Sequence, residues 1–343
     1  MEYAYRSGGI QRLKSLKREH CVGDPNGWRT VEFGFLSRCG ELMLRLADWV
    51  LVTGASGFVG GHCVQRLLEV GHNVIAMQRS PRPLTGPLSR DSDTFRYIEG
   101  DLAQGTSCTY PIRSIVHLAA QVVFPGIKAG QFAHGNILPT LGMFKLAQSL
   151  AVETVIMHSS VSVYGHPQSD TWSESTSSTA PTPYGASKYV CELVAADYAG
   201  KMRIIIPRTP GILGTGANPN WVTNLVDRAS SNQTLEIYNA AARFNSTLHV
   251  ADYCDFVLAE LASEETSPSI EVVNLAATDP IPVIKVASTI VNEVSSRSKI
   301  VDKGPSGAPA VIEIGKARTR FGFKPMSVEN TLKRYIKDIL GRS

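Results

Sequence analysis

Two polar side chains of this sequence have the types and the spacing that proton transfer requires. Tyr184 and Lys188 are four residues apart, so both lie on one face if the segment is helical. A free tyrosine hydroxyl titrates near about 10, and a neighbouring ammonium favours its phenolate form. We therefore predict that Lys188, together with the positive charge of a bound cofactor, brings the pKa of Tyr184 into the range of a general acid or base near neutral pH.

A glycine-rich turn lies upstream of this pair. Trp49 to Val52 is a short apolar run that predicts a buried strand, and helical spacing of apolar residues follows over 58–70. Between them, three glycines at intervals of three would allow a tight turn, the approach of backbone to a pyrophosphate, and close packing of helix on strand. These are Gly54, Gly57 and Gly60. The stretch predicts a dinucleotide-binding turn whose helix N-terminus attracts the phosphates, and a glycine loop without a ligand is the alternative.

The rest of the chain alternates apolar strands with amphipathic helices, which predicts an α/β fold with a doubly wound parallel sheet (a Rossmann fold) and a smaller C-terminal substrate lobe. The predicted strands are 49–53, 73–77, 95–98, 114–118, 153–158 and 203–207. The predicted helices are 58–70, 136–150 and 184–199. Such a sheet binds its ligand at the carboxyl ends of its strands, so the residues after each strand are the candidates for binding.

The predicted domains divide the chain into an extension and two functional parts. We expect residues 1–46 to be a poorly ordered N-terminal extension without catalytic function, and one hypothesis is that translation starts at Met43. Residues 47–206 would form the dinucleotide-binding domain. Residues 207–343 would form mainly the substrate lobe, with 246–263 returning to the first domain.

Composition excludes several classes of protein. The chain has 343 residues, 43% of them hydrophobic, and a net charge of +4, which is typical of a globular domain. Without a basic block interleaved with aromatics we expect no nucleic-acid partner, and without an apolar run of about 18 residues we expect no membrane span. The six cysteines are scattered without CxxC spacing, so we expect reduced thiols, a cytoplasmic location and no metal site.

Together these motifs resemble the extended short-chain dehydrogenase/reductase family, also called the NAD-dependent epimerase/dehydratase family. The glycine turn, the run His158 to Gly165, and Tyr184 with Lys188 carry the resemblance. It continues through Arg208 to Gly214, His249 to Asp252 and the tail Phe321 to Pro325, and covers about 47 to 341. It implies that Ser160, Tyr184 and Lys188 are the catalytic residues: Ser160 holds the substrate oxygen, Tyr184 moves its proton, and Lys188 also holds the nicotinamide ribose.

The resemblance also implies a cofactor site. The predicted cofactor contacts are Gly54, Ser56, Gly57, Phe58, Val59, Gly60, Arg79, Asp101, Leu102, Ala119, Ala120, Tyr184 and Lys188. An NAD enzyme usually has an acid after the second strand to bind the ribose 2′-hydroxyl, but this chain has Gln78 followed by Arg79. A neutral residue beside a cation suits a 2′-phosphate, so we favour NADP over NAD; a solvated Arg79 without a ligand is the alternative.

The same resemblance implies roles for three other side chains. Asp101 would contact the adenine, although an aspartate at that place is more often a helix cap. His117 would be packed or hydrogen bonded rather than catalytic, and Asn136 would be structural. The helices near 136–150 and 184–199 would pair in a homodimer.

Departures from the family pattern narrow the reaction. Dehydratases need an acid in the serine–tyrosine element, and Val161 and Ser162 occupy those positions, so dehydration is not expected. Sugar-nucleotide epimerases place an asparagine and an arginine on the diphosphate where this chain has Gly211 and Asn245, with Arg243 as a substitute two residues away.

We therefore predict an NAD(P)-dependent oxidoreductase that interconverts a secondary alcohol and a ketone on a nucleotide-linked sugar or a similar polar ketone. The alternatives are a nucleotide-sugar epimerase with tightly bound NAD and a non-catalytic dinucleotide sensor. The small-molecule substrate would bind against 165–183, 209–245 and 265–330, and the candidate lining aromatics are Trp172, Trp221 and Tyr238.

Overall fold

The computed structural model describes residues 49–79, 91–307 and 310–341, and the account below concerns these residues. The predicted extension, 1–46 with Met43, lies outside them.

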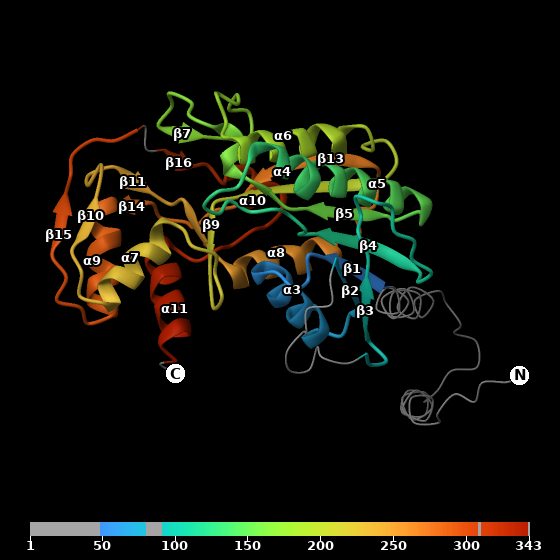
Figure 1. Ribbon diagram of the computed structural model, residues 1–343, viewed down its shortest axis with the longest axis horizontal. Coiled ribbons are helices and arrows are strands. Elements are labelled where there is room, and N and C mark those ends of the chain that lie inside the picture. The colour runs from blue at the N-terminus through green and yellow to red at the C-terminus, as the bar shows by residue number, and fades with distance from the viewer. Residues whose placement is uncertain (1–48, 80–90, 308–309, 342–343) are drawn as a thin grey trace, which may run out of the picture. The chain divides into compact units, whose positions relative to one another are not determined.

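A parallel, eight-stranded sheet forms the centre of the described chain (Figure 1). Its order is β13-β8-β5-β4-β1-β2-β3, with β6 paired to β8. The strands are β1 (Trp49–Thr53), β2 (Asn73–Gln78), β3 (Phe95–Glu99), β4 (Ile112–His117), β5 (Thr154–Met157), β6 (Ser159–Ser160), β8 (Arg203–Thr209) and β13 (Ser269–Asn274). The predicted doubly wound sheet is confirmed, and β13 is a strand that the sequence analysis did not predict. The strand order reverses between β1 and β4, which opens a crevice at their carboxyl ends.

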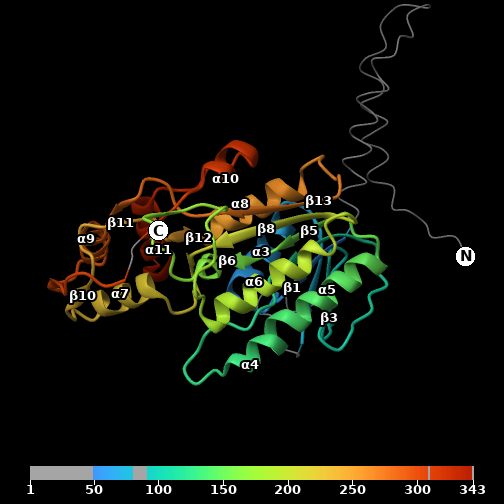
Figure 2. The same cartoon turned by 90° about the horizontal axis from the view of Figure 1, so that it is seen from above.

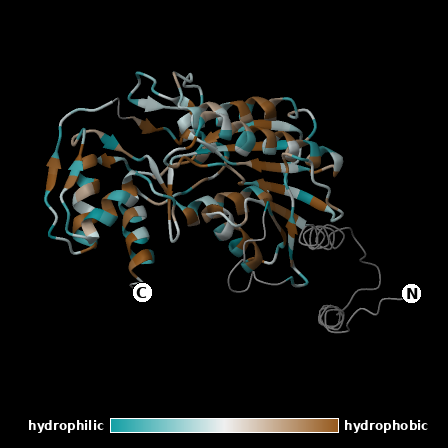
Figure 3. Ribbon diagram, viewed as in Figure 1, coloured by the Kyte–Doolittle hydropathy of each residue, from teal (hydrophilic) through white to brown (hydrophobic). Residues whose placement is uncertain are grey.

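Helices cover both faces of this sheet because its strands are apolar on both sides. Residues of α3 and α8 share one core with Val52 and Val116, whereas residues of α5 and α6 share the other with Leu51 and Ile115 (Figure 2). The helices of these layers are α3 (Phe58–Glu69), α5 (Leu138–Ser149), α6 (Pro183–Ala196), α8 (Val250–Leu261) and, near β13, the short α10 (Gly315–Arg320). Figure 3 shows the hydrophobic residues concentrated on the central strands and on the helix faces that cover them.

The helix predicted over 136–150 is different in the structure. The chain turns helical earlier, in α4 (Ala129–Phe132), then passes through a π-helical turn, η2 (Ala133–Ile137), before α5 begins with Pro139 in its first turn. A π-helical turn accommodates an extra residue, and the buried Asn136 lies within it. Periodicity of 3.6 residues cannot follow the chain through such a turn, which explains the misplaced boundary.

The C-terminal lobe is built around a separate core of three amphipathic helices. These are α7 (Trp221–Ser230), α9 (Val283–Glu293) and α11 (Val328–Leu340). Short strand pairs accompany them: β10 (Leu235–Ile237) with β15 (Ile300–Asp302), β11 (Arg243–Phe244) with β14 (Ile281–Pro282), and β9 (Gly211–Leu213) with β12 (Thr247–His249). A fourth pair, β7 (Thr171–Trp172) with β16 (Val311–Ile312), joins the loop before α6 to the C-terminal segment. Among the described helices, none is both long and apolar enough to cross a bilayer.

Candidate active site

The glycine turn between β1 and α3 is shaped by backbone contacts that exclude side chains. Gly54 has a φ of +69°, and a Cβ there would lie 2.6 Å from the backbone nitrogen of Ala119 at the end of β4. A Cβ on Gly60 would overlap the carbonyl of Gly54, so the third glycine lets α3 pack on the turn. At Gly57, the N-cap, no side chain bonds the amides of the first turn of α3. These N–H groups therefore remain available to an anionic ligand.

Two cavities adjoin this turn and bring most of the predicted site residues together. A cavity of about 540 Å³ is lined by Gly54, Ser56, Gly57, Arg79, Asp101, Leu102, Ala119 and Ala120. A second cavity, of about 740 Å³, is lined by Phe58, Val59, Ser160 and Tyr184 among others. Val122 lines both cavities, so they are neighbours. Gly60 and Lys188 line neither one.

Ser160 and Tyr184 meet at the wall of the larger cavity. Thr182 caps α6 by accepting a hydrogen bond from the Gly185 amide at 3.2 Å, which fixes Tyr184 in the first turn of the helix. Ser160 ends β6, and its Oγ accepts a hydrogen bond from the Ser162 amide at 3.1 Å. The side chain of Ser160 also lies close enough to that of Tyr184 to lower the pKa of the tyrosine. Ser160 therefore caps the short 3₁₀ helix η3 (Val161–Tyr164) and faces Tyr184 at the same time.

The pKa of Tyr184 does not behave as the sequence analysis predicts. Burial raises the pKa above its ordinary value, and the polar Ser160 beside it lowers the pKa by a smaller amount. The lowering predicted from Lys188 together with a positively charged cofactor is therefore not seen in the protein on its own. Burial disfavours the phenolate, so Tyr184 carries its proton at neutral pH.

Lys188 is a buried ammonium that the protein itself leaves without a partner. Lys188 is 2% exposed. Within the described part of the chain, its Nζ makes no hydrogen bond or ion pair. Burial lowers its pKa, while Cys191 and Glu192 raise it. Because an unpaired buried cation is costly, its position beside Tyr184 points to a ligand group that completes its hydrogen bonding.

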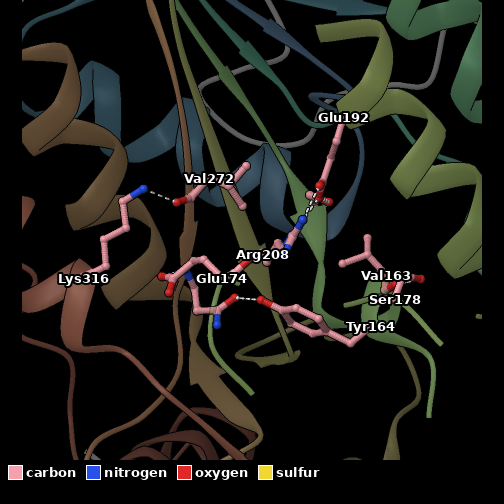
Figure 4. Close-up of polar contacts among 10 residues, drawn as sticks. Val163, Tyr164, Glu174, Ser178, Glu192, Arg208, Val272 and Lys316 are labelled. Carbon is pink, nitrogen blue, oxygen red and sulfur yellow. Dashed lines mark hydrogen bonds and ion pairs between the residues drawn. The ribbon is translucent and has the colours of Figure 1, made fainter. Parts of the chain in front are cut away.

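A buried ion pair, which the sequence analysis missed, holds α6 against the sheet (Figure 4). Arg208 of β8 donates from Nη2 to Glu192 Oε2 at 2.6 Å and from Nε to Oε1 at 3.0 Å. Ser159 donates from Oγ to the same carboxylate at 2.5 Å. Glu192 is one turn beyond Lys188 on α6 and Ser159 precedes Ser160, so this pair fixes the elements that carry the candidate site.

Further contacts extend this network to β13. The guanidinium of Arg208 lies 4.9 Å from the centre of the Tyr164 ring. Tyr164 donates from its hydroxyl to Asn274 Oδ1 at 2.6 Å, and the Asn274 amide donates to Glu174 Oε1 at 2.8 Å (Figure 4). The segment between β6 and α6, which contains Tyr164 and Glu174, is thereby tied to β13 at the edge of the sheet.

His117 and Asn136, which were expected to have supporting roles, are both buried and hydrogen bonded. His117 is buried, with Nδ1 2.8 Å from Thr53 Oγ1 and Nε2 3.2 Å from Thr140 Oγ1, so the predicted packed role is confirmed. Asn136 accepts a hydrogen bond from the Gln121 amide at 2.6 Å and donates to Ser187 Oγ at 2.8 Å, which supports its structural role.

The two polar side chains expected at the cofactor differ in their surroundings. Asp101 accepts hydrogen bonds from the Ala103 amide at 3.0 Å and from Gln104 Nε2 at 3.1 Å, so it caps a turn, as in the alternative interpretation, while it lines the smaller cavity. Arg79 is exposed and lines the same cavity.

The larger cavity is lined partly by the predicted substrate-binding segment 209–245 and includes side chains that the sequence analysis did not single out. Of the three candidate aromatics, Trp221 and Tyr238 line it and Trp172 does not. The additional lining residues include His158, Thr209, Asn220 and Phe244. His158 directly precedes the serines of β6, and Thr209 ends β8 of the central sheet. Asn220 and Phe244 come from the lobe, and the fold brings them to the cavity.

The comparisons with known proteins agree with this architecture. The NAD dependent epimerase/dehydratase family matches residues 50–276. A UDP-glucose 4-epimerase of Erwinia amylovora is 30% identical over 163 residues, which span 44% of this chain and 48% of that protein. The "Uncharacterized UDP-glucose epimerase YtcB" of Bacillus subtilis is 26% identical over 72% of this chain and 82% of its own length. The solved structure of MoeE5 in complex with UDP-glucuronic acid and NAD has a TM-score of 0.70 and 25% identity, and covers 86% of this chain and 100% of that one.

The chain therefore belongs to the NAD dependent epimerase/dehydratase family, whose members are enzymes of the extended short-chain dehydrogenase/reductase type. The resemblance identified from the sequence motifs is confirmed, and so is the Rossmann fold.

Proposed function

We propose that the protein is a nicotinamide-dinucleotide-dependent oxidoreductase that interconverts a secondary alcohol and a ketone. The observation that carries the proposal is the meeting of Ser160 and Tyr184 at the wall of one cavity, directly beside a second cavity formed by the glycine turn. The names of the relatives, which describe epimerases, and the NAD in the MoeE5 structure support a bound dinucleotide.

The residues present fit such a cofactor. The uncapped first turn of α3 offers amides to a pyrophosphate, and the buried ammonium of Lys188 lacks a partner that a ribose hydroxyl would supply. When bound, the nicotinamide would accept or supply the hydride. We favour NADP because Arg79 lines the smaller cavity next to Gln78, where an NAD enzyme has an acid. NAD remains the alternative.

The residues of the chain would divide the remaining work. Ser160 would hold the substrate oxygen by a hydrogen bond, and Tyr184 would donate the proton to that oxygen as a ketone becomes an alcohol. The raised pKa of Tyr184 keeps the hydroxyl protonated at neutral pH, which suits this direction. In the reverse direction Tyr184 would accept the proton, and Lys188 beside it would stabilise the phenolate.

We also propose that the chain has three parts and forms a dimer. The parts are an extension, 1–46, which lies outside the described residues; a dinucleotide-binding domain, 47–206; and a segment that forms mainly the substrate lobe, 207–343. The core shared by α3 and α8 supports the return of 246–263 to the dinucleotide domain. Tyr189 and Leu193, on α6, are 38% and 53% exposed, which supports a homodimer through this helix. We also propose a cytoplasmic location, in keeping with four free cysteines among the described residues.

An epimerase is the second candidate, because the Erwinia and Bacillus relatives carry that name. In an epimerase the hydride returns to the same molecule, so the dinucleotide shows no net change. A reductase instead consumes reduced dinucleotide in proportion to product. The test is the absorbance of NADPH during turnover of candidate ketones, and stoichiometric loss supports the oxidoreductase.

A dinucleotide sensor is the third candidate. It would bind NADP or NAD with a thermal shift and turn over no substrate, and the complete set of Ser160, Tyr184 and Lys188 speaks against it. The substrate is a small molecule, either a nucleotide-linked sugar or another ketone.

A further inference from the structure

The larger cavity offers no cation to a negatively charged substrate. None of the described residues that line it is a lysine or an arginine. Its basic side chain is the half-buried His158, and desolvation together with the nearby Lys188 lowers the pKa of His158 to about 3. His158 is therefore neutral at physiological pH, and Lys188 is buried outside the lining. A diphosphate bound here would lose water without gaining an ion pair, which is strongly unfavourable.

Asn245 and Arg243, the residues at or near the position where epimerases place an arginine on the diphosphate, do not line the cavity. Asn245 is buried, donates from Nδ2 to the carbonyls of Ala277 and Ile312 at 3.2 and 2.8 Å, and accepts from the Ile312 amide at 2.8 Å. Arg243 is exposed outside the lining and donates from Nη2 to the Pro280 carbonyl at 3.0 Å. Neither residue contributes a donor to the cavity.

The helix that begins at the cavity, α7, has two amides of its first turn occupied by its N-cap. Asn220, the N-cap, accepts hydrogen bonds on Oδ1 from the Val222 and Thr223 amides at 3.0 and 3.1 Å. The Asn220 amide in turn donates to Thr223 Oγ1 at 2.8 Å. This capping box satisfies the groups that would otherwise bind a phosphate. The first turn of α3, in contrast, has no such cap.

What the cavity does present is exposed apolar surface. Trp221 and Tyr238 are 38% and 47% exposed, and Val122 and Val123 are 40% and 65% exposed. All four line the cavity that contains Ser160 and Tyr184, and the Trp221 ring is held by Phe244, with ring centres 5.1 Å apart. Large apolar side chains gathered around a concave site are typical of a ligand pocket.

We propose that the substrate is an uncharged secondary alcohol or ketone carried on an apolar ring system, not a sugar linked to a nucleoside diphosphate. This inference rests on the proposed oxidoreductase function and selects its substrate class. The ring system would lie against Trp221 and Tyr238, with its oxygen at Ser160 and Tyr184. Asn218, Asn220 and Asn239 at the same wall would allow further hydroxyl groups.

Two successive titrations test the oxidoreductase function and the substrate class separately. The purified full-length protein is first titrated with NADP and NAD by thermal shift; no shift with either one contradicts the oxidoreductase itself. The dinucleotide-loaded protein is then titrated calorimetrically with neutral ring ketones (β-tetralone, decalone and cyclohexyl phenyl ketone) and with UDP-glucose. The best ketone is expected to bind at least about tenfold more tightly than UDP-glucose. UDP-glucose binding as tightly as the best ketone, or no ketone binding at all, overturns the substrate class and leaves the dinucleotide result standing.

Two variants test the proposed contact surface. Trp221→Ala and Tyr238→Ala are each expected to weaken ketone binding by about tenfold, as truncation of a buried aromatic anchor does, without changing the thermal shift by NADP. Ile339→Ala is the control, because Ile339 of α11 is 37% exposed, close to the 38% of Trp221, but lies outside the cavity, and it should bind ketone like the native protein. Unchanged ketone affinity in both cavity variants contradicts the proposal.

Discussion

Replacing Lys188 by methionine should make the protein without ligand more stable and its dinucleotide complex weaker. The native ammonium is 2% exposed and has no hydrogen-bond partner in the described structure, so methionine removes a desolvated charge while it keeps most of the packing. Such replacements of buried charge typically stabilise by about 1–3 kcal/mol. At about 2 °C per kcal/mol for a domain of this size, the melting temperature should rise by roughly 2–6 °C.

The opposite effect is expected for the dinucleotide. A hydrogen bond from a charged donor contributes about 1.5–3 kcal/mol, so Lys188→Met should weaken NADP binding roughly 10- to 150-fold. Thermal denaturation and calorimetric titration measure the two effects separately. Lys145→Met is the matched control, since Lys145 is exposed on the adjacent helix α5, and it should change stability by less than about 0.5 kcal/mol.

The dependence on pH gives a further check of the same variant. Burial lowers the pKa of Lys188 below its ordinary 10.5, so the folded state holds this proton less tightly than the unfolded state. Its destabilising effect is complete below the folded pKa and disappears as pH rises towards 10.5. The stability difference between variant and native protein should therefore shrink at alkaline pH. A variant that is less stable at pH 7 and binds NADP normally refutes the reasoning.

Three other changes have defined outcomes. Glu192→Gln leaves the buried Arg208 guanidinium without its carboxylate and should lower the free energy of unfolding in urea by about 3–5 kcal/mol; a loss under about 1 kcal/mol contradicts a structural pair. Gly54→Ala should weaken NADP binding at least about tenfold because its Cβ meets backbone at 2.6 Å. Gly71→Ala is the control, because Gly71 has a φ of +91° but open space around it, and this variant should bind NADP normally. Equal NADP binding by both variants contradicts the role of the close contact at Gly54. Burial raises the pKa of Asp252 from 3.8 to about 6, so the folded state binds this proton more tightly and native stability should fall as pH rises through that window. Asp252→Asn should flatten that fall in pH-dependent urea melts, and an unchanged profile contradicts the shift.

The sequence allowed the centre of the fold to be predicted because its strands are buried on both faces. Ile204, Ile205 and Ile206 form a continuous apolar run in β8 and are fully buried, which is the pattern of a central parallel strand. The edge strand β13 was missed because its first four residues are only half-buried, so its sequence carries a weaker apolar signal.

The candidate site could be predicted only where neighbouring residues in the chain act together. The glycine turn and the pair Tyr184 and Lys188 are local patterns, and the structure places them at adjoining cavities or directly behind them. The ion pair of Glu192 with Arg208 depends on the packing of α6 against β8, and two charged residues in separate elements have no spacing that would indicate it. The sequence analysis did not predict that burial raises the pKa of Tyr184 in the protein on its own, because a sequence does not show burial.

The most direct test of the catalytic assignment is the rate of hydride transfer in Tyr184→Phe, measured in a single turnover with the dinucleotide and the identified substrate both saturating. The account predicts a rate about 10²- to 10⁴-fold below that of the native protein, the usual contribution of a general acid, with an unchanged dissociation constant for NADP. A native rate of hydride transfer in this variant would contradict the assignment of Tyr184 as the proton donor.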